Sequence, residues 1–129
     1  MSVYMPYEGD ESRTEDYAEQ LAIIDSLIEA NPDSHVIIAG DFNVDLSRQR
    51  IHTAMLQSFC TDVGVSPVAL HQSAKFDYSY HFGMSRFSLI DHFLLSDTLF
   101  SNAVNCAYVA HDVDNTSDHE PIFATRLGR

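Results

Sequence analysis

Apolar side chains recur at helical spacing in two parts of the chain. One series advances in steps of four, three and four: Tyr17, Leu21, Ile24 and Ile28. A second advances in steps of four: Ile51, Met55, Phe59 and Val63. Each series predicts one face of an amphipathic helix. Ser12 and Glu15 have the spacing of a capping box and predict the start of the first helix. Asn31-Pro32 predicts its end, and Gly64 predicts the end of the second.

Shorter apolar runs predict strands at residues 2–5, 36–39, 89–95, 104–109 and 121–127. The run 36–39 is apolar throughout, which is typical of a strand covered on both faces. Residues 65–85 have a weak pattern and predict a long loop with at most one short strand. Because strands alternate with two helices, we expect a layered α/β fold in one small domain, residues 1–129.

The net charge of the chain says more about its possible ligands than its length does. There are 19 Asp and Glu against seven Lys and Arg, a net charge of −12. This balance argues against tight nonspecific binding to a polyanion and is compatible with a site where divalent metal ions supply positive charge.

No segment has the length of a membrane span, and no basic region followed by an apolar run opens the chain. We therefore expect no membrane contact and an intracellular protein, nuclear or cytoplasmic and not secreted. Cys60 and Cys106 lack metal-ligand spacing and are expected to be small buried apolar residues.

Polar clusters interrupt three of the apolar runs. They are Gly40-Asp41-Phe42-Asn43, Asp91-His92 and Asp118-His119-Glu120. Each cluster alone is better explained by a plain turn or by an edge strand that faces water. Together, in this order and each at a strand end, they favour an active site, because ligand groups gather at such ends.

Asp91 lies among leucine, isoleucine and phenylalanine, where an unpartnered carboxylate would be protonated or destabilising. His119 is the natural partner, since a carboxylate bonded to one ring nitrogen fixes the tautomer and leaves the other nitrogen free to act. His92 points to the opposite face of the strand and is expected to be structural.

The three clusters also resemble a known family. Gly40-Asp41-Phe42-Asn43, Ser88-Leu89-Ile90-Asp91-His92 and Asn115-Thr116-Ser117-Asp118-His119 resemble, in this order, the second half of the endonuclease/exonuclease/phosphatase superfamily. They are most like the endonuclease domains of non-LTR (LINE-type) retrotransposons. The resemblance implies the C-terminal half of a two-sheet α/β sandwich (DNase I-like), truncated at its N-terminus.

The resemblance implies a role for each residue of the clusters. Asp41 would align or deprotonate the attacking water, and Asn43 would stabilise the transition state. His119, held by Asp91, would bind the scissile phosphate or act as base. Asp118 would lie on the metal side, with Mg²⁺ or Mn²⁺ as the cofactor.

Three further residues are implied in substrate binding. Tyr4 matches the tyrosine of the family's Y-x-P strand, which approaches the scissile phosphate. Ser79 and Ser88 match an aromatic-rich segment near the DNA, and ordinary β packing explains them equally well. DNA would be the substrate, and fusion to a reverse transcriptase is the expected context.

The resemblance also implies a missing part. The family's first half carries an Asn and a Glu that binds Mg²⁺, and no Glu here matches that motif. We therefore expect an incomplete domain, inactive alone, whose sheet has an uncovered apolar face. Two alternatives stay open: a phosphatase or phosphodiesterase of the same superfamily acting on a lipid or nucleotide, and a catalytically dead remnant that only binds a partner.

Overall fold

The computed structural model describes the backbone of residues 1–126 and the side chains of residues 1–100 and 107–125. Its centre is a four-stranded sheet in the order β1-β2-β7-β3. These strands span Ser2–Tyr4, Ile37–Asp41, Asp91–Ser96 and Val65–Pro67. β1 is parallel to β2, and β7 is antiparallel to both β2 and β3.

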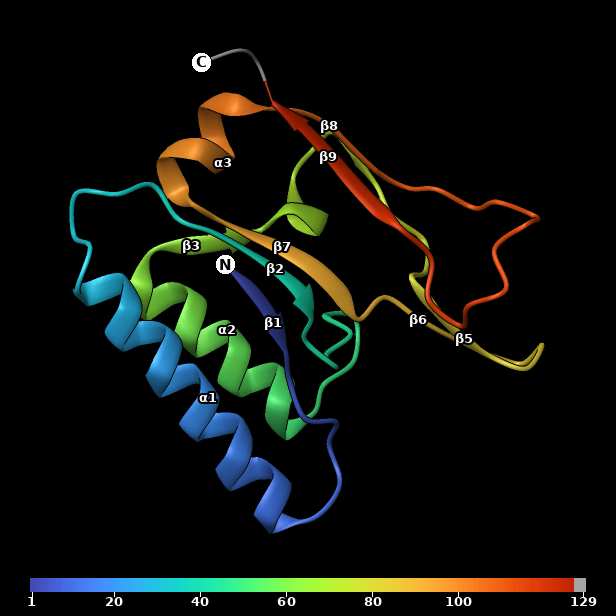
Figure 1. Ribbon diagram of the computed structural model, residues 1–129, viewed down its shortest axis with the longest axis horizontal. Coiled ribbons are helices and arrows are strands. Elements are labelled where there is room, and N and C mark those ends of the chain that lie inside the picture. The colour runs from blue at the N-terminus through green and yellow to red at the C-terminus, as the bar shows by residue number, and fades with distance from the viewer. Residues whose placement is uncertain (127–129) are drawn as a thin grey trace.

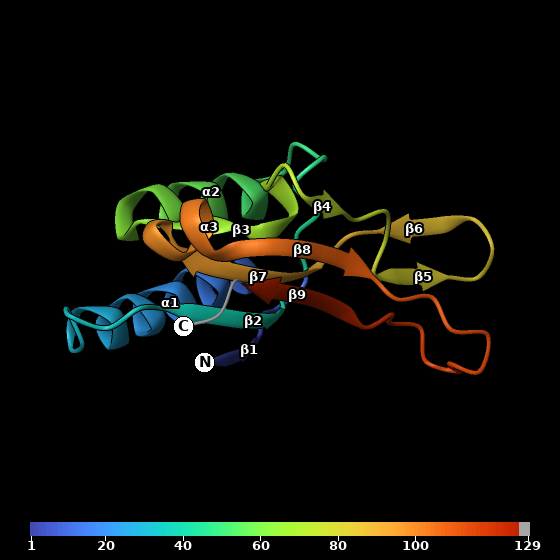
Figure 2. The same ribbon diagram turned by 90° about the horizontal axis from the view of Figure 1, so that it is seen from above.

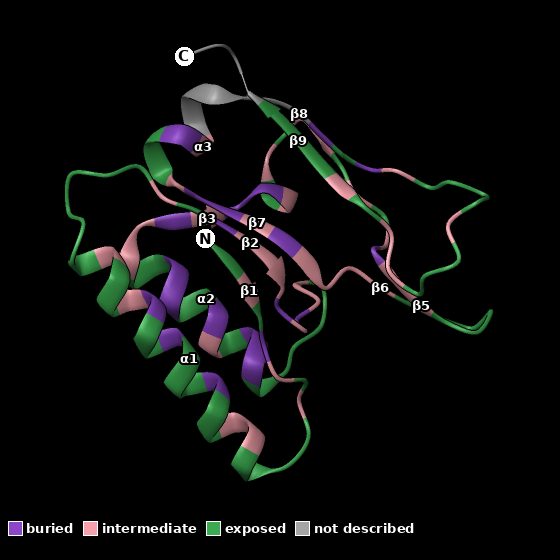
Figure 3. Cartoon of the chain, viewed as in Figure 1, coloured by how far each residue is buried: buried purple, intermediate pink, exposed green. Residues whose placement is uncertain are grey.

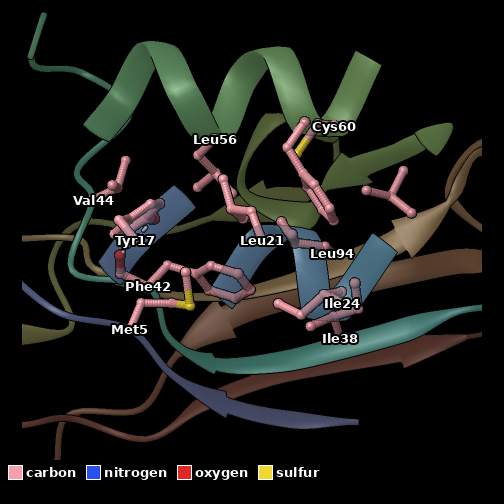
Figure 4. Packing of buried hydrophobic residues seen from close by; sticks show 12 residues of the cluster. Met5, Tyr17, Leu21, Ile24, Ile38, Phe42, Val44, Leu56, Cys60 and Leu94 are labelled. Carbon is pink, nitrogen blue, oxygen red and sulfur yellow. Dashed lines mark hydrogen bonds between the residues drawn. The ribbon is translucent and has the colours of Figure 1, made fainter. Parts of the chain in front are cut away.

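Two helices, α1 (Glu11–Glu29) and α2 (Ile51–Val63), cover one face of this sheet (Figure 1). The positions predicted for α1 face inward, and Figure 4 shows Tyr17, Leu21 and Ile24 packed with Phe42 and Leu94. In α2 the prediction was partly wrong: Phe59 is buried, but Ile51 is 62% exposed and Leu56 is fully buried in its place. Gly64 ends α2 with a left-handed φ of 75°, as predicted. The start of α1 differs, because Asp10 rather than Ser12 is the N-cap and accepts a hydrogen bond from the Arg13 amide.

A second sheet lies on the other side of β7. It has the order β4-β8-β9, with strands at Ala74–Lys75, Val104–Val109 and Ile122–Arg126. A short 3₁₀ helix (Val68–Leu70) and α3 (Asp97–Ala103) complete this layer. A smaller apolar cluster, Val68, Leu95, Leu99 and Ala107, joins the two sheets. The layered α/β fold expected from the sequence is confirmed.

A hairpin, β5 (Tyr80–Phe82) and β6 (Arg86–Ser88), projects from one end of the sheets beside the loop that precedes β9 (Figures 1 and 2). Residues 65–85 thus hold three strands and a 3₁₀ helix, and the expectation of a long loop with at most one strand was wrong. These elements have two or three residues each, too few for a periodic pattern to show.

The burial of β2 also corrects the sequence analysis. Ile38 is fully buried against the helices, whereas Ile37 is 43% exposed on the opposite face. The second sheet packs on β7 and leaves the outer face of β2 open, so the run 36–39 is covered on one face only. Figure 3 shows exposed residues along β1 and β9 and buried ones along β7.

Cys60 is buried in the core, and burial raises the pKa of its thiol to about 12. The side chain of Cys106 lies outside the described residues. Within the described part of the chain, no helix is both long and apolar enough to cross a bilayer.

Candidate active site

Two carboxylates face each other at the end of the central sheet. Asp41 is the last residue of β2, Asp91 is the first of β7, and the two are register partners. Side chains alternate along a strand, and Ile38 and Leu94 point to the helices, so both carboxylates point to the opposite face. Tyr4 of β1 is the register partner of Asp41. The three residues therefore form one row across three strands.

Gly40 explains how the row is held together. Its φ of 147° suits glycine, and a Cβ at this position would lie 1.9 Å from the carbonyl oxygen of Val3. β1 and β2 therefore approach so closely that only glycine fits.

His119 joins the two carboxylates. Its Nδ1 lies 2.8 Å from Asp91 Oδ2, and its Nε2 lies 3.7 Å from Asp41 Oδ2. Since an ionised carboxylate only accepts, Nδ1–H donates to Asp91 and Nε2 faces Asp41. The side chain of His119 is 35% exposed, against 11% for Asp41. His119 is therefore the most exposed side chain of this trio.

The pKa values of His119 and Asp41 are both raised. Partial burial alone would lower the pKa of His119, but the hydrogen bond to Asp91 and the charges of Asp91, Asp41 and Asp118 outweigh it and raise the pKa above the ordinary value of 6.5. Burial also raises the pKa of Asp41, and the charges of Asp91 and Asp118 add to this effect. The Asn43 amide and His119 oppose it. Both shifts favour the protonated form of the group, while a positive charge on His119 favours the ionised form of Asp41.

Asn43 follows Asp41 in a tight turn and has a left-handed φ of 49°. Its amide N–H donates to Asp41 Oδ1 at 2.9 Å, and its side-chain Nδ2 donates to the Met5 carbonyl at 2.6 Å. The side-chain amide has two hydrogens, so one is left for a ligand. The turn that the sequence suggested is present, and it holds Asn43 beside Asp41.

Ser79 is buried and holds the backbone beside Asp91 in place. Its hydroxyl oxygen accepts hydrogen bonds from the Ile90 and Asp91 amides, both at 3.0 Å, and the residue is fully buried. A substrate cannot reach such a hydroxyl, so the expected contact with substrate is replaced by the positioning of Asp91. Ser88 lies half-buried in β6, where its carbonyl accepts from the Ser79 amide at 3.0 Å. Tyr4 is 76% exposed beside Asp41.

A group of three residues has the donors for a divalent cation. One ligand atom each from Asp41, Asp91 and His119 lies within 4.8 Å of the others. Carboxylate oxygens suit Mg²⁺ and Mn²⁺, and an imidazole nitrogen suits Mn²⁺. Asp118, the metal ligand expected from the sequence, is exposed and outside this group, although its charge acts on His119 and Asp41.

His92 is fully buried on the opposite face, where Nε2–H donates to the Val44 carbonyl at 2.7 Å. The structural role expected for it is confirmed.

The sequence analysis missed Tyr80 and a loop network. Tyr80 forms an isolated β-bridge with His119, and the two rings are 5.1 Å apart. His111 lies 2.9 Å from Asp77 and 3.8 Å from Glu120, which ties the loop before β9 to the start of the hairpin. Tyr80 begins a strand of only three residues, and Asp77 and His111 lie in loops, so no periodic signal marked them.

Comparisons with known proteins bear on the fold. No family model matches the sequence, and no curated protein matches it. Among solved structures, a 3′ phosphatase (NExo) from Neisseria bound to product DNA hairpin matches 98% of this chain at 16% identity and a TM-score of 0.76. The Xenopus laevis APE2 catalytic domain matches 96% at 16% identity and 0.75. The endonuclease domain of TRAS1, a telomere-specific non-LTR retrotransposon, matches 97% at 17% identity and 0.67.

The match covers only part of each of these proteins. The chain spans 60% of the Neisseria phosphatase, 48% of the Xenopus domain and 54% of the TRAS1 domain. Over this part, the chain has the fold of endonuclease/exonuclease/phosphatase proteins.

Proposed function

We propose that the chain forms part of a divalent-metal-dependent phosphodiesterase, a DNA endonuclease of the retrotransposon type. The observation that carries this proposal is His119 between two register-paired carboxylates, with one ring nitrogen bonded to Asp91 and the other turned to Asp41. Neighbours of this fold include a phosphatase bound to a DNA product and a retrotransposon endonuclease domain. Fusion to a reverse transcriptase belongs to the same proposal, and the reading frame around the gene tests it.

Each residue of the site has a separate role in the proposed reaction. His119, whose pKa is raised by its hydrogen bond to Asp91, donates from Nε2 to a phosphate oxygen in its protonated form, while Asp91 holds the ring. Asp41 is 3.7 Å from Nε2 and accepts a proton from the attacking water. Asn43 donates its free amide hydrogen to a second phosphate oxygen. Tyr4 contacts the phosphate from the exposed edge.

A bound Mg²⁺ or Mn²⁺ would be held by Asp41 and Asp91, with Asp118 near enough to act through its charge, and would offset the negative charge on the leaving oxygen. We propose that this chain alone binds Mg²⁺ weakly, since Mg²⁺ keeps several waters and needs further oxygen ligands.

Plasmid nicking in Mg²⁺ and in EDTA tests the function. Two preparations are compared: the chain alone, and the chain extended at its N-terminus by the first half of a relative. We expect EDTA-sensitive nicking by the extended form that His119→Ala and Asp41→Asn each lower by about 10²-fold or more. Leu27→Ala, on the exposed face of α1, is the matched control. If neither form nicks DNA, or if nicking survives both substitutions, the proposed function is wrong.

A further inference from the structure

The few cations of this acidic chain are unevenly placed. Three of the seven Lys and Arg residues, Arg48, Arg50 and Arg86, line one hollow between the loop after β2 and the β5–β6 hairpin. We call this space the arginine hollow. Arg48 joins its two walls, because its Nη2 donates to the Phe87 carbonyl of the hairpin at 2.8 Å.

The arginine hollow adjoins the candidate active site. It consists of two adjoining cavities of about 310 and 570 Å³ that share the three arginines. The first is also lined by Asn43, which is bonded to Asp41. The second is lined by Tyr80, whose ring lies against His119. Neither cavity is lined by Asp41, Asp91 or His119, so the hollow adjoins the site through Asn43 and Tyr80.

Two acids, Asp45 and Glu8, also line the first cavity, where three arginines face two carboxylates, whereas no acid lines the second cavity. Asp45 accepts hydrogen bonds from the Ser47 amide and hydroxyl and from the Leu89 amide, and its charge acts on Arg48. Glu8 accepts from the His52 amide at 2.8 Å. Arg50 and Arg86 form no salt bridge with any residue that the structure describes.

The position of Arg50 is costly for the fold alone. It is the N-cap of α2, makes no side-chain capping bond, and no acidic residue lies in the first turn. A cation at the positive end of a helix is unfavourable, and Arg is a poor N-cap. One anion already lies at this helix end, because the Glu8 carboxylate accepts from the His52 amide, so the case for a ligand rests on the three arginines and not on the helix end.

The hairpin adds aromatic surface to this charge. Phe87 lines the hollow and is 45% exposed, and Phe82 is exposed on the same hairpin. Arginines that track a backbone, together with aromatic rings on which bases stack, are the combination by which proteins hold single-stranded nucleic acid. Inorganic phosphate and polyglutamate carry no ring that could stack on these aromatic side chains.

We propose that the arginine hollow is a subsite for the nucleotides that flank the scissile phosphate in a single-stranded or unpaired segment, with Arg48, Arg50 and Arg86 on successive phosphates and Phe87 under a base. This inference rests on the proposed function, because the hollow adjoins the place where the scissile phosphate would lie. It also explains how a chain of net charge −12 holds a polyanion: the positive charge is concentrated beside the site.

Fluorescence anisotropy of the chain with a labelled single-stranded DNA, in EDTA and over a range of salt, tests the subsite. Three phosphate contacts predict a slope of log K against log salt of about −2. Arg50→Gln and Arg86→Gln should each weaken binding and make the slope shallower by about 0.7. Phe87→Ala should weaken binding without changing the slope. Lys75→Gln, an equal charge change on β4, should alter neither.

Two competitors separate other ligands from nucleic acid. Inorganic phosphate and polyglutamate, at matched charge, should displace the DNA poorly. Equal displacement by either, or an equal effect of Lys75→Gln and Arg86→Gln, would overturn the proposal. Thermal melts by circular dichroism verify that these exposed substitutions leave the fold intact.

The subsite and the proposed function fail in different ways. If His119→Ala abolishes nicking but Arg86→Gln binds DNA as Lys75→Gln does, the subsite alone is wrong. If the arginine variants lose binding but nicking does not depend on His119, the proposed function is wrong and the inference that rests on it falls as well.

Discussion

Asp41 and Asp91 are register partners on neighbouring antiparallel strands, so two acidic side chains lie directly opposite each other. Like charges in this position repel and weaken a sheet. The charge of Asp91 contributes to the raised pKa of Asp41, which is the signature of that repulsion. The pair therefore costs stability at neutral pH and is useful only where a cation or a protonated His119 lies between the two groups.

Asp41→Asn should for this reason stabilise the metal-free chain, although the same substitution is expected to lower nicking by the extended form. The new amide oxygen still accepts from the Asn43 amide, and one of the two opposed charges is gone. We expect a gain of about 0.5 kcal/mol in the free energy of unfolding, measured in urea at neutral pH. Because the chain alone is proposed to bind Mg²⁺ weakly, only a high Mg²⁺ concentration should offset this difference in stability, by stabilising the wild type and not the variant. A loss of stability in the metal-free variant would contradict the repulsion.

His119 should make stability depend on pH. Its folded pKa is raised above the unfolded value, so the protonated ring stabilises the fold. That contribution is complete below the unfolded value of 6.5 and is lost as pH rises through the folded value. Buried His52 and His92 have lowered pKa values, so their contribution to stability is lost as the pH falls below 6.5.

The comparison with His119→Gln isolates the effect. Between about pH 6 and pH 8, the melting temperature of the wild type should fall relative to that of the variant. Parallel curves for the two proteins would show that His119 is not coupled to the carboxylates.

Replacing His92 should lower the free energy of unfolding more than replacing His119 does. His92→Ala leaves the Val44 carbonyl unpaired in the core and opens a cavity, so we expect a loss of about 3 kcal/mol in urea unfolding. The partly exposed His119 should cost less than about 1 kcal/mol when replaced by alanine. Similar losses from both substitutions would mean that His119 is structural.

Ser79→Ala should destabilise the fold and make the position of Asp91 less fixed. Two amides, those of Ile90 and Asp91, lose their acceptor in a buried place, which costs about 2 kcal/mol. The pKa of His119, followed by NMR, should fall toward its ordinary value as Asp91 becomes less well placed. Ser88→Ala is the control on the neighbouring strand and should leave that pKa unchanged.

The helices and the Asp91–His119 pair were open to prediction because each leaves a local physical signal. Both helices show an apolar repeat, and a carboxylate inside an apolar strand needs a partner. The hairpin, α3 and Ser79 gave no such signal. The strands there are too short for periodicity, and a serine that caps two amides resembles any other serine until the fold is known.

The arginine hollow was hidden for a related reason. Arg48 comes from a loop and Arg86 from a three-residue strand far along the chain, and the net charge of −12 argues against binding to a polyanion. Only the fold shows that these cations share one space.

The row of Tyr4, Asp41 and Asp91 also protects the sheet against misassembly. Side chains alternate along a strand, so a slip of one residue by β2 or β7 would turn a carboxylate into the apolar layer that holds Phe42 and Leu94. An unpaired charge there is far costlier than the repulsion in the native row. The same side chains that would meet the substrate thus reject every odd-numbered shift of the strands, and an attempt to neutralise them for stability would also remove this safeguard.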